Sequence, residues 1–400
     1  MGGRDARGPV IGAAVDPPAT AQAKLGSGGQ RIAVLLPLSG PRAELATPLS
    51  QAVQLALDTP GAPPYDKIDT AGTAEGAAEA ARRAIAQGAG IIVGPLSSTE
   101  TAAVAPIAGP AGVPVLAFTN DPARAAPGVW PLGIGPAQQV YRLASALNAQ
   151  GKSRIAGLLP ESEFGSAMAL ALTQTAAALG QPEPTIRRYP SGAGVGALNP
   201  VIRELSNYAG RRGPIEAERR AASASGTAEG RRRAAEIGRR GVPPAPFDAL
   251  LLADSGEIME SLAALLAYYD VDPAHVRVLG PSSWAAPNSG AAYLRGAWFA
   301  APDPAARTGF ESAFSARFGG PPPALADIAF DAASIARVAA AAGGYTIANI
   351  ARADGYIGAN GLVVLQPDGQ VRRGLAIFEV QRGGPQMIEP PPQSVTAPGA

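Results

Sequence analysis

The chain has 400 residues, of which 46% are hydrophobic and 5% aromatic, and its formal net charge is +1. This length and apolar content suffice for two domains with mainly aliphatic cores. The near-zero charge gives no reason to expect nucleic acid or an acidic partner. The sequence contains no cysteine, which excludes disulfides, thiolate metal ligands, cysteine nucleophiles and lipid attachment to a cysteine of this sequence.

Residues 1–29 are rich in Gly, Ala and Pro, and we interpret them as a disordered segment. Their only apolar run, Pro9 to Val15, is too short and broken for a signal-peptide core. We therefore expect either a cytoplasmic protein or a true start upstream of Met1. No segment approaches the roughly 20 consecutive apolar residues of a membrane-spanning helix.

The first part of the chain alternates short apolar runs with helical patterns, which predicts an α/β fold with a parallel, doubly wound sheet. The predicted strands are 31–38, 91–93 and 113–118, and the predicted helices are 45–57, 77–87 and 101–109. Ser97 precedes Glu100 by three residues, the spacing of a helix capping box. Such a helix start favours an anion, and the hydroxyls of Ser97 and Ser98 add donors. The alternative is a well-capped helix without a ligand.

A second α/β unit repeats this pattern. We expect helices at 138–149, 167–179, 200–208 and 258–268, and strands at 154–159, 185–189, 247–253 and 276–279. Its opening run RIAGLLP, at 154–160, nearly repeats RIAVLLP at 31–37. This repetition indicates two similar lobes.

The segment 211–240 holds 9 Arg and 4 Glu, a local charge of +5. One interpretation is a site for an anionic surface, such as membrane headgroups or nucleic acid. The other is a solvated helical excursion in which Glu and Arg pair at helical spacing. The absence of interleaved aromatic residues for base stacking favours the second interpretation. We expect the segment to protrude as an exposed helix or loop.

The last part of the chain returns to helices, predicted at 307–318, 327–342 and 346–352. Pro367-Asp368-Gly369 between two apolar runs predicts a β-hairpin whose second arm is 373–380. The Pro-rich tail, 384–400, is expected to be disordered.

The sequence offers little support for catalysis. His275 is the only histidine, and one His without Cys builds no metal site. Gly165-Ser166 lacks a nucleophile elbow, and Gly192 to Gly196 lacks the third glycine of a dinucleotide fingerprint. We therefore expect no cofactor and no enzyme activity. What remains are polar residues at the ends of predicted strands, which would line a cleft between two lobes. They are Ser97, Ser98, Thr119, Asn120, Glu161, Asp254, Ser282 and Ser283.

Six motifs in order carry a resemblance to a known family: RIAVLLPLSG, IIVGPLSSTE, VPVLAFTND, LLPESEFGSA, FDALLLAD and VRVLGPSSW. Over roughly residues 31–383 the chain resembles the type I periplasmic binding proteins, in particular the leucine/isoleucine/valine-binding branch. The Arg-rich segment before FDALLLAD, and LRGAWFAAPDP after GPSSW, resemble the sub-branch of penicillin-binding protein activators. The best-known members of that sub-branch are outer-membrane lipoproteins that stimulate a peptidoglycan synthase.

The resemblance implies two Rossmann-like lobes joined by a three-segment hinge. Lobe 1 would hold 31–134 and 304–358, and lobe 2 would hold 135–303 and 359–383. The crossings would lie near 133–137, 298–304 and 358–361.

The resemblance also implies a ligand site. Serines after the Gly-Pro turn and a Thr at the next strand end hold the ligand in amino-acid-binding members, and they map to Ser97, Ser98 and Thr119. An aromatic residue of the second lobe maps to Phe164. Two positions depart from the pattern: Asp254 stands where an aromatic is frequent, and Ser282 where an acidic residue is frequent.

The leading functional hypothesis is a non-enzymatic periplasmic protein of the activator sub-branch, acting through contacts with the cell-wall machinery. The second is the substrate-binding protein of an ABC importer for an amino acid or another small polar ligand. An enzyme is the third. The implied partner is either a peptidoglycan synthase or an ABC permease.

Overall fold

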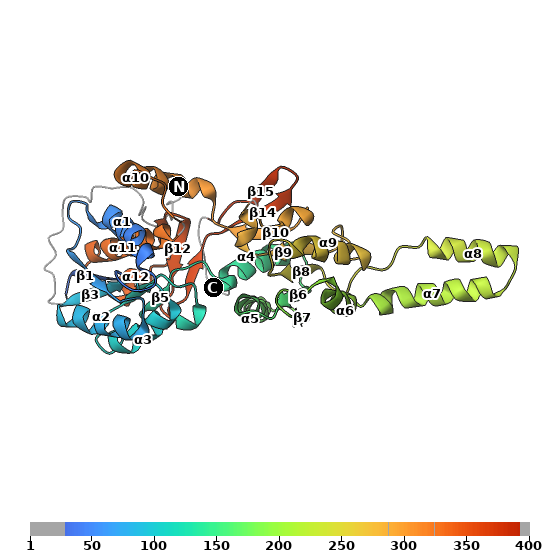
Figure 1. Cartoon of the computed structure of the whole chain (residues 1–400), viewed down its shortest axis with the longest axis horizontal. Coiled ribbons are helices and arrows are strands. Elements are labelled where there is room, and N and C mark those ends of the chain that lie inside the picture. Colours follow the sequence, from blue (N-terminus) through green and yellow to red (C-terminus); the bar gives the residue numbers. More distant parts are fainter. Residues whose placement is uncertain (1–28, 287, 324, 393–400) are drawn as a thin grey trace, which may run out of the picture. The chain divides into compact units, whose positions relative to one another are not determined.

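The computed structural model describes residues 29–286, 288–323 and 325–392, which form two compact units (Figure 1). Of the described residues, unit 1 comprises 29–135, 302–375 and 391–392, and unit 2 comprises 136–301 and 376–390. Segments 1–28 and 393–400, which fall in the two termini expected to be disordered, lie outside the described residues.

Unit 1 is built on an open sheet with the strand order β2-β1-β3-β4-β5. Every neighbouring pair in it is parallel, which confirms the predicted sheet type. The strands are β1 (Arg31–Leu36), β2 (Tyr65–Asp69), β3 (Ala89–Val93), β4 (Val115–Ala117) and β5 (Val129–Pro131).

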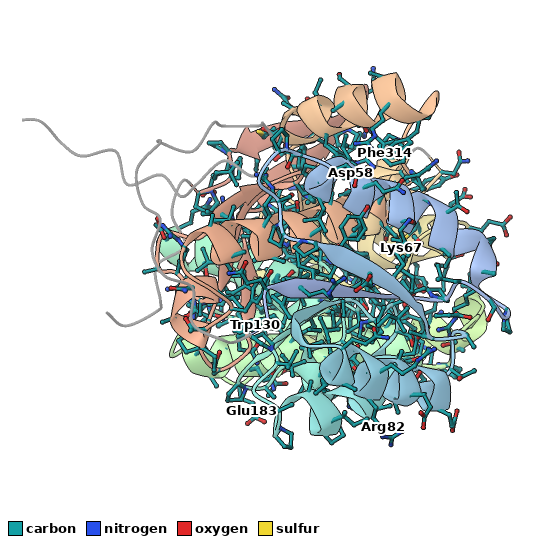
Figure 2. The ribbon with its side chains drawn as sticks, turned by 90° about the vertical axis from the view of Figure 1, so that its left-hand side faces the viewer. Asp58, Lys67, Arg82, Trp130, Glu183 and Phe314 are labelled. Atoms are coloured by element: carbon teal, nitrogen blue, oxygen red, sulfur yellow. The ribbon has the colours of Figure 1, made fainter. Side chains whose placement is uncertain are left out.

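Helices cover both faces of this sheet. The helices α1 (Ala46–Leu57), α10 (Pro304–Phe318) and α11 (Ala326–Ala341) share one core cluster with the sheet, and α2 (Ala74–Ala86) and α3 (Ser98–Ala108) share another. Alternate residues of β1 enter the two clusters, so both faces of the strand are buried, which explains its unbroken apolar sequence. Figure 2 shows Arg82 at the outer surface of α2, whereas Trp130 of β5 is fully buried.

Unit 1 also holds the short helix α12 (Ile347–Ile350) and an antiparallel sheet of β11 (Tyr356–Gly358), β12 (Gly361–Leu365) and β13 (Val371–Arg373). The Trp130 indole Nε1 donates to the Gln366 carbonyl at 2.7 Å. This bond ties β5 to the hairpin turn that follows β12.

Unit 2 has the strand order β15-β14-β10-β9-β8-β6-β7. The segment from β10 to β7 is parallel, and β14 and β15 are added antiparallel. The strands are β6 (Ile155–Pro160), β7 (Ile186–Tyr189), β8 (Ala249–Leu252), β9 (Arg277–Gly280), β10 (Trp298–Ala301), β14 (Ala376–Gln381) and β15 (Gly384–Glu389). The helices packed on this sheet are α4 (Pro136–Ala149), α5 (Glu163–Ala178), α6 (Val195–Leu205) and α9 (Ile258–Tyr268).

The end of the chain differs from the prediction in two ways. The last passage from unit 1 to unit 2 comes at Leu375–Ala376 rather than near 358–361, because β12 and β13 pair with β11 and stay in unit 1. The predicted second hairpin arm, 373–380, is therefore split between β13 and β14. Residues 384–389, expected to be disordered, form β15, because they satisfy the backbone groups along the free edge of β14.

The Arg-rich segment forms two helices, α7 (Tyr208–Ala224) and α8 (Ala228–Gly238), which pack side by side as a hairpin of unit 2 (Figure 1). We call residues 208–240 the arm. Most of its side chains are exposed, as predicted. Within α7 the buried residue is Arg211, and within α8 the buried residues are Gly230, Ala234 and Ile237.

Candidate functional site

A tight turn leads from β3 into α3 and places the first candidate residues. Gly94 has φ +95, and a Cβ added there would lie 2.4 Å from the Leu35 carbonyl oxygen, so the turn requires glycine. Ser97 caps α3, since its hydroxyl accepts from the Glu100 amide and its own amide donates to Glu100 Oε2 at 2.9 Å. The predicted capping box is confirmed.

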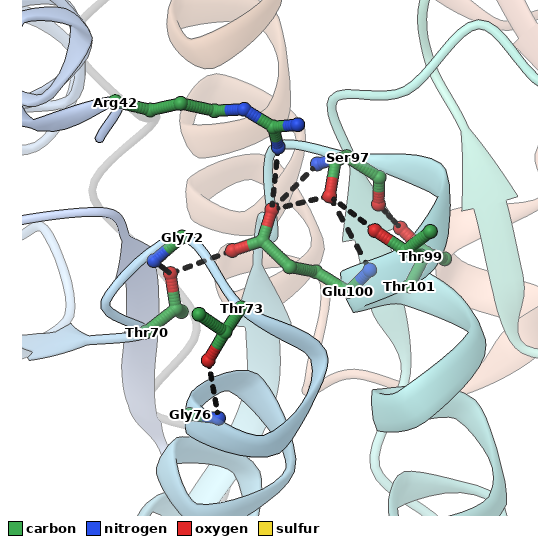
Figure 3. Close-up of polar contacts among 9 residues, drawn as sticks. All are labelled: Arg42, Thr70, Gly72, Thr73, Gly76, Ser97, Thr99, Glu100 and Thr101. Atoms are coloured by element: carbon green, nitrogen blue, oxygen red, sulfur yellow. Dashed lines mark hydrogen bonds and ion pairs between the residues drawn. The ribbon is translucent and has the colours of Figure 1, made fainter. Parts of the chain in front are cut away.

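Glu100 is the centre of a buried polar network (Figure 3). Its carboxylate accepts hydrogen bonds of 2.6 Å from the Ser97 hydroxyl and 2.6 Å from the Thr70 hydroxyl, and it lies 3.9 Å from the guanidinium of Arg42. The Ser97 hydroxyl therefore already donates its hydrogen bond to a carboxyl group of the protein itself.

Asp121 connects the next two candidates. The Ser98 hydroxyl donates to Asp121 Oδ2, and the Asp121 amide donates to Thr119 Oγ1 at 3.1 Å. Partial burial acts to raise the pKa of Asp121, but hydrogen bonds from Ser98 and the Ala123 amide, with the charge of Arg124, hold it below its usual range. The structure thus brings Ser98 and Thr119 to one residue, Ser98 through the Asp121 carboxylate and Thr119 through the Asp121 backbone amide. Sequence reasoning missed Asp121, although an Asp-Pro pair directly after a strand end is a signal for a capping residue.

Asn120 lies beside the segment that follows β5. A Cβ added at Gly133 would lie 2.7 Å from the Asn120 Cβ, so the two backbones are in close contact. Asn120 is exposed. Its position is fixed by this contact within unit 1.

In unit 2, Asp254 follows β8 and is half-buried. Its carboxylate accepts a hydrogen bond from the hydroxyl of Tyr189, and its backbone carbonyl accepts one from the indole of Trp284 at 2.8 Å. Tyr189 and Trp284 are both fully buried. Burial raises the pKa of Asp254 above its usual value.

The other unit 2 candidates are positioned by their backbones. The amide of Glu161 donates to the carbonyl of Tyr189 at 2.7 Å, and the amide of Ser282 donates to Gln139 Oε1 at 2.7 Å. Ser282 and Ser283 stand on the same short 3-10 helix as Trp284. Phe164, on the first turn of α5, keeps 39% of its surface exposed.

The described residues contain no group of His, Asp and Glu side chains that could hold a metal ion. His275 is exposed and contacts Asp272, its i−3 neighbour, at 3.3 Å. A pocket of about 370 Å³ in unit 1 lies at the amino ends of β1 and β3, whereas Ser97 and Thr119 follow the carboxyl ends of β3 and β4. Its lining, which includes Gln30, carries no charged side chain. In the described part of the chain, no helix is both long and apolar enough to cross a membrane.

Comparisons with known proteins agree with this architecture. A family model described as "Periplasmic binding protein" matches residues 29–208. A putative branched-chain amino acid ABC transporter from Rhodospirillum rubrum is 20% identical with a TM-score of 0.64, and the match covers 90% of this chain and 99% of that one. No curated protein matches the chain in sequence.

Two further solved structures represent different kinds of protein. The C-domain of LpoA from Haemophilus influenzae, a regulator of PBP1A, is 17% identical with a TM-score of 0.60, covering 90% of this chain and 99% of that one. A solute-binding protein of an ABC transporter from Rhodopseudomonas palustris, in complex with 3,4-dihydroxy benzoic acid, is 18% identical with a TM-score of 0.54, covering 92% and 98%. The chain has the type I periplasmic binding protein fold, of the leucine-binding-protein kind. At these identities the likeness establishes the fold and not the ligand or partner.

Proposed function

We propose that the protein is a non-enzymatic periplasmic regulator of the penicillin-binding protein activator type, which acts on a peptidoglycan synthase through protein contacts. The observation that carries this proposal is the occupation of the predicted ligand donors by carboxylates. Ser97 donates to Glu100 and Ser98 donates to Asp121.

These two carboxylates disfavour an amino-acid ligand bound through its own carboxylate. The ligand would have to displace a carboxyl acceptor from each hydroxyl and would approach the negative charge of Asp121. Taking the Ser97 hydroxyl away from the buried Glu100 removes one of its three hydrogen bonds, at a cost of roughly 1.5–3 kcal/mol. The turn is therefore suited to a structural role, which supports the regulator over the importer.

The regulator proposal is tested by measuring binding to a purified peptidoglycan synthase from the same organism. We expect saturable binding and a change in the rate of glycan polymerisation or cross-linking when this protein is added. An unrelated type I periplasmic binding protein serves as the control. Absence of binding from a folded, monodisperse sample would refute the proposal.

One observation favours the second candidate, a substrate-binding protein. Asp254, half-buried and hydrogen-bonded by Tyr189, is a group on which a cationic ligand would bind. Calorimetric titration with common L-amino acids and polyamines, with melting temperatures measured in parallel, tests this candidate. Saturable heat that disappears in Asp254→Asn would support it, since binding to the native state also raises the melting temperature. If none of these ligands produces heat, the substrate-binding candidate is excluded and the regulator proposal remains.

A further inference from the structure

The arm is anchored to unit 2 through Arg211. The guanidinium of Arg211 donates to backbone carbonyls of three separate segments: Ser206 at 2.8 Å, Pro243 at 2.8 Å, and Tyr269 at 2.6 Å. It also lies 5.8 Å from the ring centre of Tyr208. One buried side chain therefore joins the start of α7 to two neighbouring loops of unit 2.

The two helices of the arm are held together by small residues and by paired charges. Gly230 and Ala234 of α8 are buried at the seam, and Arg219 of α7 lies against Gly238. Each glutamate of α7 contacts two arginines. Glu216 pairs with Arg212 and Arg219, both at 2.8 Å, and Glu218 pairs with Arg240 at 2.7 Å and Arg233 at 3.9 Å.

This pairing leaves an excess of positive charge on the outside of the arm. Among the described residues, no carboxylate lies within ion-pair distance of Arg220, Arg231, Arg232 or Arg239, and all four are exposed. Arg231 and Arg239 donate to nearby backbone carbonyls, which leaves their charge uncompensated. The charge of these four arginines is therefore available to a molecule outside the chain.

One side of the arm combines this charge with a shallow groove of about 600 Å³. Small side chains of both helices line it, and Arg219 and Arg220 stand at its edge. The small residues are Ser223, Ala224, Ala234 and Ala235. Arg231 precedes Ala234 and Ala235 by three and four residues, so it lies on the same face of α8.

We propose, building on the proposed regulatory function, that this face of the arm is the docking surface for an acidic segment of the partner protein. The groove lets the backbone of the segment approach closely, and Arg220 and Arg231 bind its carboxylates. Arginine is enriched at protein interfaces because its planar guanidinium binds carboxylates in two-pronged fashion.

Two observations favour a protein over an anionic membrane. The tip of the arm, residues 223–228, reads Ser-Ala-Ser-Gly-Thr-Ala and has no aromatic or large aliphatic side chain to enter a bilayer. Glu229 and Glu236 are also exposed on α8, and a uniformly negative lipid surface would repel them. A partner protein can place its charges to match both signs.

The test places a photo-crosslinking amino acid at Ser223 in whole cells, with Gln174, an exposed residue of α5, as the control position. We expect Ser223 alone to trap one protein, with the crosslink mapping to an acidic segment.

That protein, purified, should bind the wild-type chain with an affinity that falls as salt concentration rises. Arg220→Glu with Arg231→Glu should weaken binding by at least about tenfold. The control variant carries Arg82→Glu and Arg203→Glu, at two exposed arginines outside the arm. It makes the same charge change and should bind with the affinity of the wild type.

The outcomes separate this inference from the regulatory proposal. If a peptidoglycan synthase binds the wild type and the Arg220/Arg231 variant equally, the regulatory function stands and the docking surface is wrong. If the synthase does not bind but another protein is trapped through an acidic segment, the docking surface stands and the regulatory function is wrong. No trapped protein, or binding to phosphatidylglycerol vesicles that the Arg220/Arg231 variant loses, would overturn the docking inference.

Discussion

Asp331 and Arg373 form an ion pair that is almost completely buried in unit 1. Arg373 donates to Asp331 at 2.8 Å and to the carbonyl of Leu132 at 2.6 Å, and Asp331 accepts from the Ala359 amide at 2.6 Å. Burial raises the pKa of Asp331, and the charge of Arg373 opposes that shift. The pair joins α11, β13 and the segment that follows β5. Within unit 1 the pair therefore holds two segments in place, β13 and the residues after β5. Each of them leads to a point where the chain passes into unit 2.

We predict that Arg373→Met lowers the free energy of unfolding by about 3–5 kcal/mol, because it leaves the Asp331 charge buried without its partner. Arg82→Met, which breaks the exposed pair with Glu79, should cost less than about 1 kcal/mol. Urea denaturation of both variants measures the difference. Equal stabilities of the two variants would contradict this account of the buried pair.

Asp254 gives a prediction about pH. Because burial raises its pKa in the folded protein, the fold disfavours the carboxylate. This penalty is absent below the unfolded pKa, near 4, and complete above the folded pKa. Asp254→Asn, which can still accept from Tyr189, should therefore melt at a higher temperature than the wild type at pH 7. The gap should close as the pH falls towards about 4.

Glu183→Gln, at an exposed loop position, is the control for this experiment and should leave the melting temperature unchanged at every pH. A lower melting temperature of Asp254→Asn at pH 7 would show that the Asp254 carboxylate is stabilised by the fold rather than disfavoured.

At this scale the sequence predicts contacts that are local. The capping box of Ser97 and Glu100 follows from a spacing of three residues, and the structure contains it. The ion pair of Asp331 with Arg373 spans 42 positions, and the bond from Ser98 to Asp121 spans 23. No spacing rule joins residues so far apart, since tertiary packing brings them together.

Three of the strands that sequence patterns identified are buried on both faces. The runs at β1, β3 and β8 are continuously apolar because helices cover both sides of their sheets. The pattern missed β2, whose sequence Tyr-Asp-Lys-Ile-Asp is largely polar, because β2 is the edge strand of its sheet. The resemblance misplaced the last passage between units, and the pattern could not correct it, since an apolar strand has the same sequence signature in either unit.

The arm offers a test at the scale of elements. Arg211→Ala removes the hydrogen bonds to the carbonyls of Ser206, Pro243, Asp270 and Tyr269. We predict a loss of about 1–3 kcal/mol, the cost of leaving buried polar groups unpaired. Amide hydrogen exchange of α7 should accelerate while exchange of β8 and β9 stays slow. Arg220→Ala, on the exposed face of the same helix, should change neither quantity; if it matches Arg211→Ala, the anchor assigned to Arg211 is wrong.

For the whole molecule, the parallel sheet type followed from alternating strands and helices, and the resemblance over 31–383 indicated the type I periplasmic binding protein fold. Function is less accessible from sequence, because proteins of this one fold include importer components and a regulator of PBP1A. The proposed regulatory role rests on the carboxyl groups of Glu100 and Asp121, which accept hydrogen bonds from two serines that the resemblance assigned to a ligand.

The arm also allows a prediction for the molecule as a whole. Its outer part contributes few side chains to the core of unit 2, so shortening it should leave the fold intact. Glu218 and Arg240 are joined at 2.7 Å, which brings the two chain segments close enough to be connected by a short Gly-Ser linker in place of 219–238. This deletion keeps Arg211 and its carbonyl partners.

The shortened protein should keep the far-ultraviolet circular dichroism of its remaining helices and strands, and its urea unfolding should stay cooperative. Its midpoint should match the wild type, because surface segments without core contacts change stability little. A second variant with the same deletion and Arg211→Ala should be destabilised, since the root of the arm is then lost as well. If the shortened protein alone unfolds gradually or at a much lower urea concentration, the outer arm must be part of the core of unit 2. In that case Arg220 and Arg231 would no longer belong to a separate surface, and their proposed role in docking would need to be reassigned.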